Sequence, residues 1–179
     1  MCVDLMRDKA SKFPTLESKD NIRRMRIWHC KYKTLQPLAE FQHLEELVIA
    51  SFPDETLEAL APLRKLRYLS ILHMPKITDL RELHHLSGLE SLALATSPAW
   101  DASGKCNVVK SLEPIGVITG LKHIELFGVC QLDKSLAPLE QLKNLRSARF
   151  SQYPQAEIDR FFRVTGVLNQ FNPKSSFGP

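Results

Sequence analysis

A pattern of hydrophobic and polar positions recurs six times along the chain. Each copy reads apolar-x-x-apolar-x-apolar, and the copies begin at positions 22, 44, 66, 89, 121 and 145. The starts are separated by 22, 22, 23, 32 and 24 residues, so four of the five spacings agree within two residues. The end of each copy alternates between apolar and polar residues, which places both apolar side chains on one face of a short strand. The sequence therefore predicts a repeated strand-forming unit.

A second pattern, with a period of three, lies between these copies. Its apolar members are Leu35-Leu38-Phe41, Leu57-Leu60-Leu63, Leu80-Leu83-Leu86, Leu112-Ile115-Ile118, Leu136-Leu139-Leu142 and Ile158-Phe161-Val164. A spacing of three predicts a 3₁₀ turn or one face of a short helix. Pro37, Pro114 and Pro138 begin three of these turns, where the fixed φ of proline suits a helix and no required amide donor is lost.

This unit resembles the leucine-rich repeat, in the class of about 22 residues found in bacterial internalins, over roughly residues 22–165. The resemblance implies an α/β solenoid: a right-handed superhelix of six repeats with a parallel concave sheet and short 3₁₀ or α turns on the convex side. Repeats must stack because one unit cannot bury its apolar side alone. The family usually has Asn, Cys or Thr nine positions into the repeat. Only Cys30 conforms well among the six residues found there, so we expect an irregular turn: Cys30, Phe52, Met74, Ser97, Val129 and Tyr153.

The chain is expected to form a single domain over residues 1–179. We expect a cap over 1–21, with Val3, Met6, Ala10 and Phe13 at helical spacing, then repeats over 22–154. A capping helix is expected over 155–171 and a flexible tail over 172–179. The helix would present one apolar face made of Ile158, Phe161, Phe162, Thr165 and Leu168. Repeat four is about ten residues too long, and we expect the excess, residues 97–110, to form a loop at one rim of the concave face.

Strand geometry predicts which side chains line the concave face. The last outward position of each strand is apolar in five of six repeats: Trp28, Ala50, Leu72, Ala95, Phe127 and Ser151. A solvated sheet face is normally polar, and an exposed apolar patch indicates an association site. We expect this stripe either to bind a partner or to lie beneath the insertion or a terminal segment. Trp100, in the insertion, either contacts the partner or folds over the sheet as a lid.

The predicted partner-binding residues combine the stripe with its flanking side chains: Arg24, Arg26, Trp28, Tyr68, Leu72, Trp100, His123, Glu125, Phe127 and Arg149. Charges around an apolar patch favour a protein partner. Residues 1–33 hold nine Lys and Arg against four Asp and Glu, but Glu45 and Glu46 interrupt this basic patch. Nucleic acid is therefore the less favoured partner. Self-association through the stripe is an open alternative.

Composition and motifs exclude several other classes. The 179 residues carry a net charge of +4, are 44% hydrophobic and include 27 Leu, which describes a folded globular chain. The sequence contains no H-E-x-x-H, G-x-S-x-G, P-loop or Rossmann motif. We therefore expect no catalytic residues, metal or cofactor. The four cysteines form no C-x-x-C pair and no apolar run approaches the ~20 residues of a membrane span, so we expect a cytoplasmic protein.

The favoured function is a non-enzymatic protein–protein interaction module that binds its partner on the concave face. The alternative is an immunity or antitoxin-type protein that neutralises a cognate bacterial toxin by binding it. An enzyme or a nucleic-acid binder is the less favoured third class. The Leu-x-Pro-Leu signature at Leu35 and Leu136 resembles that of internalins and favours a bacterial source.

Overall fold

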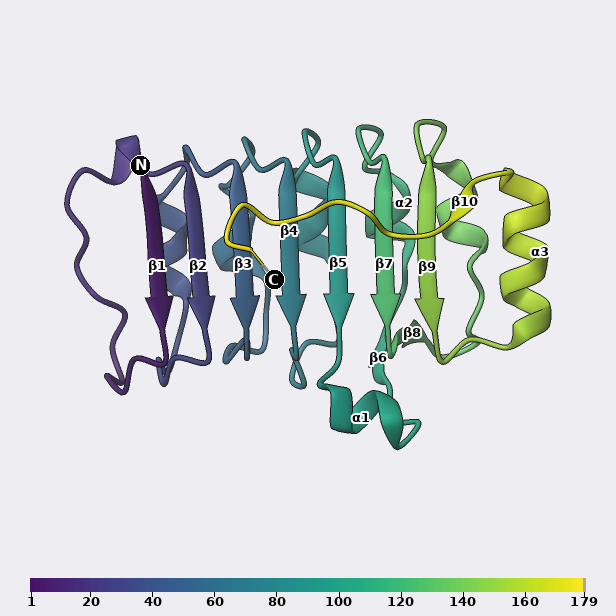
Figure 1. The fold of residues 1–179 in the computed structure, drawn as a ribbon, viewed down its shortest axis with the longest axis horizontal. Helices are drawn as coiled ribbons and strands as arrows, with labels where there is room; N and C mark the ends of the chain where they lie inside the picture. Colours follow the sequence, from purple (N-terminus) through teal and green to yellow (C-terminus); the bar gives the residue numbers. More distant parts are fainter. Residues whose placement is uncertain (179) are drawn as a thin grey trace.

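The computed structural model describes residues 1–178, in which eight parallel strands form one sheet (Figure 1). Six of the strands belong to the predicted repeats, and one more strand extends the sheet at each end. Along the sheet they are β1 (Cys2–Met6), β2 (Arg24–Trp28), β3 (Glu46–Ala50), β4 (Tyr68–Leu72), β5 (Ser91–Ala95), β7 (His123–Phe127), β9 (Ser147–Ser151) and β10 (Leu168–Asn169).

Short helical turns form a second layer on the convex side of the sheet (Figure 1). They are η2 (Gln36–Glu40), η3 (Glu58–Leu60), η4 (Arg81–His85), α2 (Glu113–Gly116) and η5 (Ala137–Gln141). A further turn, η1 (Lys19–Asn21), lies beside the amino terminus (Figure 1) and contains no buried residue. Pro37, Pro114 and Pro138 lie at the first or second position of η2, α2 and η5, as predicted. The alternation of strands and turns confirms the predicted solenoid.

The core lies between the two layers and runs the length of the molecule. Strand pairing is unshifted from repeat to repeat, so that Leu47 pairs with Leu69, and Leu69 with Leu92. Equivalent leucines therefore stack in continuous rows, and those of the turns do the same behind them. Leu47, Leu60 and Leu83 are fully buried. Each such side chain contributes about 1.5–3 kcal/mol of hydrophobic stabilisation relative to exposure.

The chain leaves most strands through the same left-handed turn. The residue after the strand has a φ between 51° and 72° in six cases: Arg7, His29, Ser51, His73, Gly128 and Gln152. The inserted segment of repeat four interrupts this series, because Thr96 follows β5 without a positive φ. Because the same turn recurs, the carboxyl ends of the strands line up along one side of the sheet, hereafter its carboxyl edge.

The amino-terminal residues form a strand and not the helix that their spacing predicts. β1 pairs in parallel with β2, and the Arg7 N–H donates a hydrogen bond to the Trp28 carbonyl at 2.8 Å. Val3 and Leu5 alternate with exposed residues and pack against the core. The free edge of β2 presents backbone groups that need partners, and a strand satisfies them where a helix would not.

At the other end, α3 (Gln155–Thr165) packs over the last repeat. Phe161 is fully buried, and its ring meets that of Phe150 edge-on with 5.2 Å between centroids. The helix ends at Thr165, six residues before the predicted end, and is followed by Gly166, whose φ of 68° gives a left-handed cap. Leu168 consequently lies on β10 and is exposed, so it is not on the apolar face of the helix as predicted.

The insertion in repeat four contains a short helix, α1 (Pro98–Ala102), followed by β6 (Asn107–Val109). β6 pairs in parallel with β8 (Val129–Gln131), and Asn107 is the partner of Val129. Asn107, not Ser97, therefore occupies the position equivalent to Val129 in the next repeat. Its buried amide donates a 2.8 Å hydrogen bond to the Ile77 carbonyl. Repeat four thus has the Asn that the resemblance implies, displaced by ten residues.

Residues 170–178, hereafter the crossing segment, return from β10 across the concave face toward β3 (Figure 1). They include most of the predicted tail, of which residue 179 lies outside the described residues. No helix within residues 1–178 combines the length and hydropathy needed to cross a membrane.

Candidate protein-binding surface

The sheet places nine of the ten predicted site residues on its concave face. Each projects from a strand position that alternates with core residues, as in β4, where buried Leu69 and Ile71 separate partly exposed neighbours. The strand register then sets them in columns that run across the repeats. On β2 these residues are Arg24, Arg26 and Trp28; on β4, Tyr68 and Leu72; on β7, His123, Glu125 and Phe127; on β9, Arg149.

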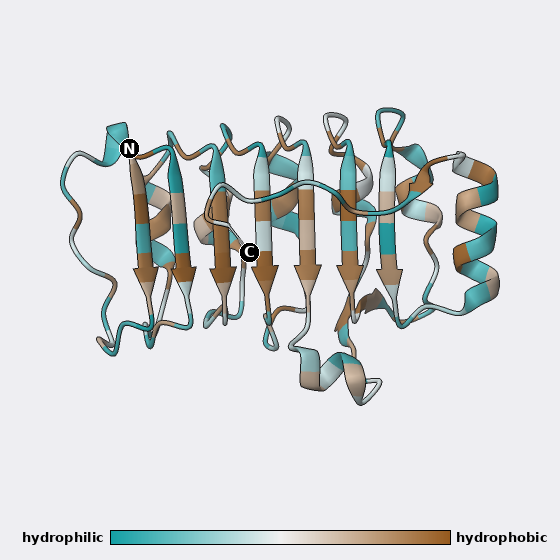
Figure 2. Cartoon of the chain, viewed as in Figure 1, coloured by the Kyte–Doolittle hydropathy of each residue, from teal (hydrophilic) through white to brown (hydrophobic). Residues whose placement is uncertain are grey.

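The apolar stripe lies along the carboxyl ends of these strands, most of which are coloured hydrophobic in Figure 2. Trp28, Leu72 and Phe127 are each partly exposed, whereas Ala50 is buried. The Arg149 guanidinium lies 4.5 Å from the centre of the Phe127 ring, close enough for a cation–π interaction. The stripe is thus a shallow apolar strip that includes two aromatic rings.

Trp100 lies at the end of the strands, not over the sheet. Its ring meets the His73 ring edge-on, with 5.2 Å between centroids. The surrounding helix is held by Asp101, whose carboxylate accepts a hydrogen bond from Ser151 Oγ at 2.7 Å. The Asp101 carbonyl accepts another from Gln152 Nε2 at 2.8 Å. The insertion therefore extends the carboxyl edge of the sheet, and its aromatic ring continues the apolar stripe.

Two histidines stand at this edge. His29 Nδ1 is 3.1 Å from Ser51 Oγ, whereas the buried Nδ1 of His73 has no hydrogen-bond partner among residues 1–178. Burial lowers the pKa of His73, and the nearby His29 adds a smaller effect in the same direction. Within the described part of the chain, no three His, Cys, Asp or Glu side chains converge as a metal site.

Several predicted rim charges are already paired. Arg149 contacts one Glu125 oxygen through both Nη2, at 2.6 Å, and Nε, at 2.7 Å. Burial raises the pKa of Glu125, and Arg149 opposes that shift. Arg26 makes a two-point pair with Asp4, at 2.9 and 2.7 Å, which lowers the pKa of Asp4. Only some of the predicted charged residues are therefore available to a partner. On β2, Arg24 is exposed, whereas Arg26 is partly buried.

The middle of the face holds two further predicted residues. His123 Nδ1 is 2.8 Å from Ser147 Oγ, and burial, followed by nearby Arg146 and Lys122, lowers its pKa. Tyr68 has a raised pKa, chiefly through burial and then through the negative charges of Glu46 and Glu125. These ionisable groups therefore share one partly desolvated region.

Glu46 is the functional candidate that the sequence reasoning missed. Its carboxylate accepts hydrogen bonds from Ser175 and Ser176 of the crossing segment. The sequence contains no local signal for these contacts, because they join residues 129 and 130 positions apart. The crossing segment lies in front of β9, β7, β5 and β4 before it reaches β3 (Figure 1), and its hydrogen bonds to Glu46 and Arg26 anchor it at β3 and β2. A terminal segment therefore covers part of the concave face, whereas Trp28, Leu72 and Phe127 of the apolar stripe are partly exposed.

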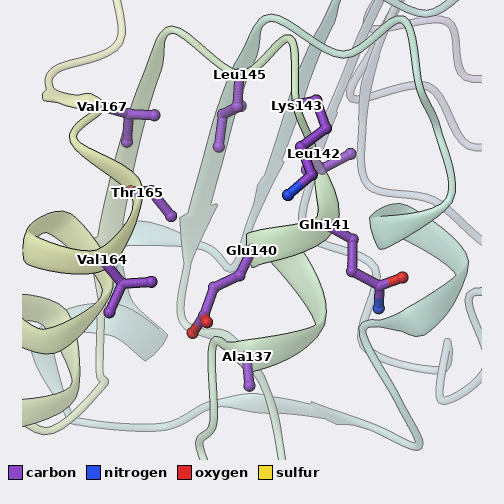
Figure 3. Close-up of a pocket in the computed structure, with 9 residues that line it drawn as sticks. All are labelled: Ala137, Glu140, Gln141, Leu142, Lys143, Leu145, Val164, Thr165 and Val167. Carbon is purple, nitrogen blue, oxygen red and sulfur yellow. The ribbon is translucent and has the colours of Figure 1, made fainter.

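A hollow of about 750 Å³ lies elsewhere, between η5 and the end of α3 (Figure 3). Its lining is formed by Ala137, Glu140, Gln141, Leu142, Lys143, Leu145, Val164, Thr165 and Val167. Glu140 is held by Arg160 at 2.6 Å, which ties η5 to the closing helix. This contact gives the Glu140 carboxylate a packing role, and the concave face remains the candidate surface.

Two internalins are among the solved structures that share this fold. Internalin C2 of Listeria monocytogenes matches with a TM-score of 0.61 and 17% identity, over 84% of this chain and 63% of that one. The internalin InlF of the same bacterium matches with a TM-score of 0.52 and 20% identity, over 81% of this chain and 46% of that one. The chain thus has an internalin-like leucine-rich-repeat fold and spans less than two thirds of either protein. No protein-family model and no curated protein matches the sequence.

Proposed function

We propose that the protein binds another protein on the concave face of its sheet and catalyses no reaction. The observation that carries this proposal is the partly exposed apolar stripe at the carboxyl ends of the strands. Trp28, Leu72 and Phe127 lie along it, and Trp100 continues it onto the insertion. Aromatic residues dominate the binding energy of protein interfaces, and a rigid solenoid holds them without a large entropic cost.

Charges around the stripe support a protein partner in preference to nucleic acid. Arg26 and Arg149 are paired with carboxylates of this chain, which leaves less positive charge for phosphates. The Glu46 carboxylate lies on the same face, bound to hydroxyls and an amide, and its charge would repel a polyanion. The proposal places the protein in the cytoplasm, and four unpaired cysteine thiols among the described residues support that choice.

The test is affinity capture from the native lysate, with the double variant Trp28→Ala/Phe127→Ala beside the wild type. Each ring at a hot spot contributes about 2 kcal/mol or more, so the double variant should weaken partner binding by roughly 1,000-fold. Its thermal midpoint should change little, because both rings are partly exposed. Binding is then measured by titration calorimetry with the purified partner.

A matched control removes two apolar side chains away from the stripe. Val117 and Leu132 are 53% and 87% exposed and lie outside the concave strands, so Val117→Ala/Leu132→Ala should retain partner binding. Equal loss in both variants, or a large fall in stability of the Trp28/Phe127 variant, would contradict the proposal. A captured toxin that the wild-type chain neutralises on co-expression would make the protein an immunity protein.

A further inference from the structure

The Glu46 carboxylate binds two serines of the crossing segment. Ser175 Oγ donates to Glu46 Oε1 at 2.7 Å, and Ser176 Oγ donates to Oε2 at 2.6 Å. The Ser176 N–H also donates to Oε1, at 2.7 Å. Both oxygens of Glu46 are therefore used, and hydrogen bonds to an ionised acceptor are about twice as strong as neutral ones.

Arg26 holds the residue that follows the two serines. Its Nη1 donates to the Phe177 carbonyl at 3.3 Å, and its guanidinium lies 5.2 Å from the centre of the Phe177 ring. Asp4 fixes the other side of the same guanidinium, at 2.9 and 2.7 Å. Arg26 is thus oriented before it meets the segment, which reduces the entropy lost on binding.

These contacts have the character of ligand recognition. Glu46 accepts hydrogen bonds from two adjacent hydroxyls and one backbone amide. Arg26 donates one to a carbonyl and lies over an aromatic ring. All of these groups belong to an extended backbone or to common side chains, so a segment of another protein can supply them. Beside Glu46, Val48 is only 6% exposed on the concave side of β3.

We propose that Glu46 and Arg26 form a binding site for an extended peptide in which two adjacent hydroxyl residues precede an aromatic residue. Ser175–Phe177 occupies this site within the same chain, and a partner's segment of the same chemistry replaces it. A tethered segment acts at an effective concentration on the order of 1 mM. An incoming segment that is present at a lower concentration must therefore bind this site more tightly than Ser175–Phe177 does. The identity of the partner rests on the proposed function, whereas the site itself does not.

The first experiment measures how tightly the segment is held in the full chain. Trypsin cleaves after Lys174, directly beside Ser175, and needs this stretch to be released from the sheet. Glu46→Ala should accelerate cleavage at that bond at least tenfold. Ser175→Ala/Ser176→Ala should do the same while leaving the sheet unchanged.

The matched control is Glu45→Ala, which removes the same charge from the neighbouring residue. Glu45 lies 3.7 Å from Arg23 and makes no side-chain contact with the segment. Its variant should be cleaved at the wild-type rate. Equal rates for the Glu45 and Glu46 variants would overturn the proposal, provided that circular dichroism shows both folded.

The second experiment asks whether the site accepts a peptide from outside. In the full chain with Ser175→Glu and Ser176→Glu, the new carboxylates face Glu46 and should release the segment by repulsion. A fluorescent peptide with the sequence of residues 170–178 should then bind, as seen by anisotropy. Adding Glu46→Ala should weaken its binding at least tenfold, as should alanine at both serines of the peptide.

Failure of the peptide to bind after the segment is released would show a structural strap and not a binding site, and would overturn the proposal. Neither experiment uses the unidentified partner or the aromatic stripe. Their failure would therefore leave the proposed function standing, just as loss of the proposed function would leave this site intact.

Discussion

Replacing Asn107 by alanine is expected to destabilise the fold by about 2 kcal/mol. Asn107 is 4% exposed, and its side-chain amide donates a 2.8 Å hydrogen bond to the carbonyl of Ile77 in the preceding repeat. The substitution removes a bond with a net contribution of about 1 kcal/mol and leaves a buried carbonyl without its donor, which costs a further 1–3 kcal/mol or so. Relaxation around the small cavity offsets part of that sum.

Asn144 provides the matched comparison. Its amide also donates a 2.8 Å hydrogen bond to a backbone carbonyl, that of Thr119, but the residue is exposed. Water can replace the lost donor there, so Asn144→Ala should cost no more than about 0.5 kcal/mol. Urea unfolding followed by circular dichroism gives both values from the shift in midpoint at constant slope. Equal losses in the two variants would refute the reasoning, because bond length alone would then decide the cost.

Two further predictions concern protonation and close packing. Lowering the pH from about 7.5 to about 5 should destabilise the fold. Burial lowers the pKa values of His73 and His123 below 6.5, so both histidines take up protons more readily in the unfolded chain. The stability present above pH 6.5 is therefore lost as the pH falls through the folded-state pKa values. His73→Gln should reduce that slope in urea midpoints measured across this range. At Gly116, a Cβ would lie 2.2 Å from the Pro138 carbonyl oxygen, so Gly116→Ala should cost about 1–3 kcal/mol. Gly88→Ala, with its nearest atom at 3.5 Å, should leave the thermal midpoint almost unchanged.

The repeats were predictable because their information is local. Each strand is specified by alternating residues such as Leu47 and Ile49, and each turn by a period of three that begins near a proline such as Pro138. Since stacking preserves the register, one correct repeat positions all the others. The concave columns, including Trp28 and Phe127, follow from the same periodicity.

The ends and the insertion were harder to predict because distant residues decide them. Val3, Met6 and Ala10 fit a helix when considered alone, but the open edge of β2 makes a strand more favourable. Asn107 appears ten residues after its expected place, and only its pairing with Val129 reveals its role. Helical spacing likewise cannot show that Gly166 ends α3 before Leu168.

The concave charges separate into two kinds according to the source of their partners. Asp4 and Arg26 are 22 positions apart, and Glu125 and Arg149 are 24 apart, which is one repeat in each case. Such pairs follow from the register, because the solenoid places equivalent positions side by side. The hydrogen bonds of Glu46 instead come from residues 129 and 130 positions away, outside the stacked repeats. Arg26 has both kinds of contact, because it pairs with Asp4 and also donates a hydrogen bond to the Phe177 carbonyl, 151 positions away. Glu46 differs from Arg149 and Glu125 in that its side-chain hydrogen bonds join it to the crossing segment, which is the position expected of a group that binds a ligand.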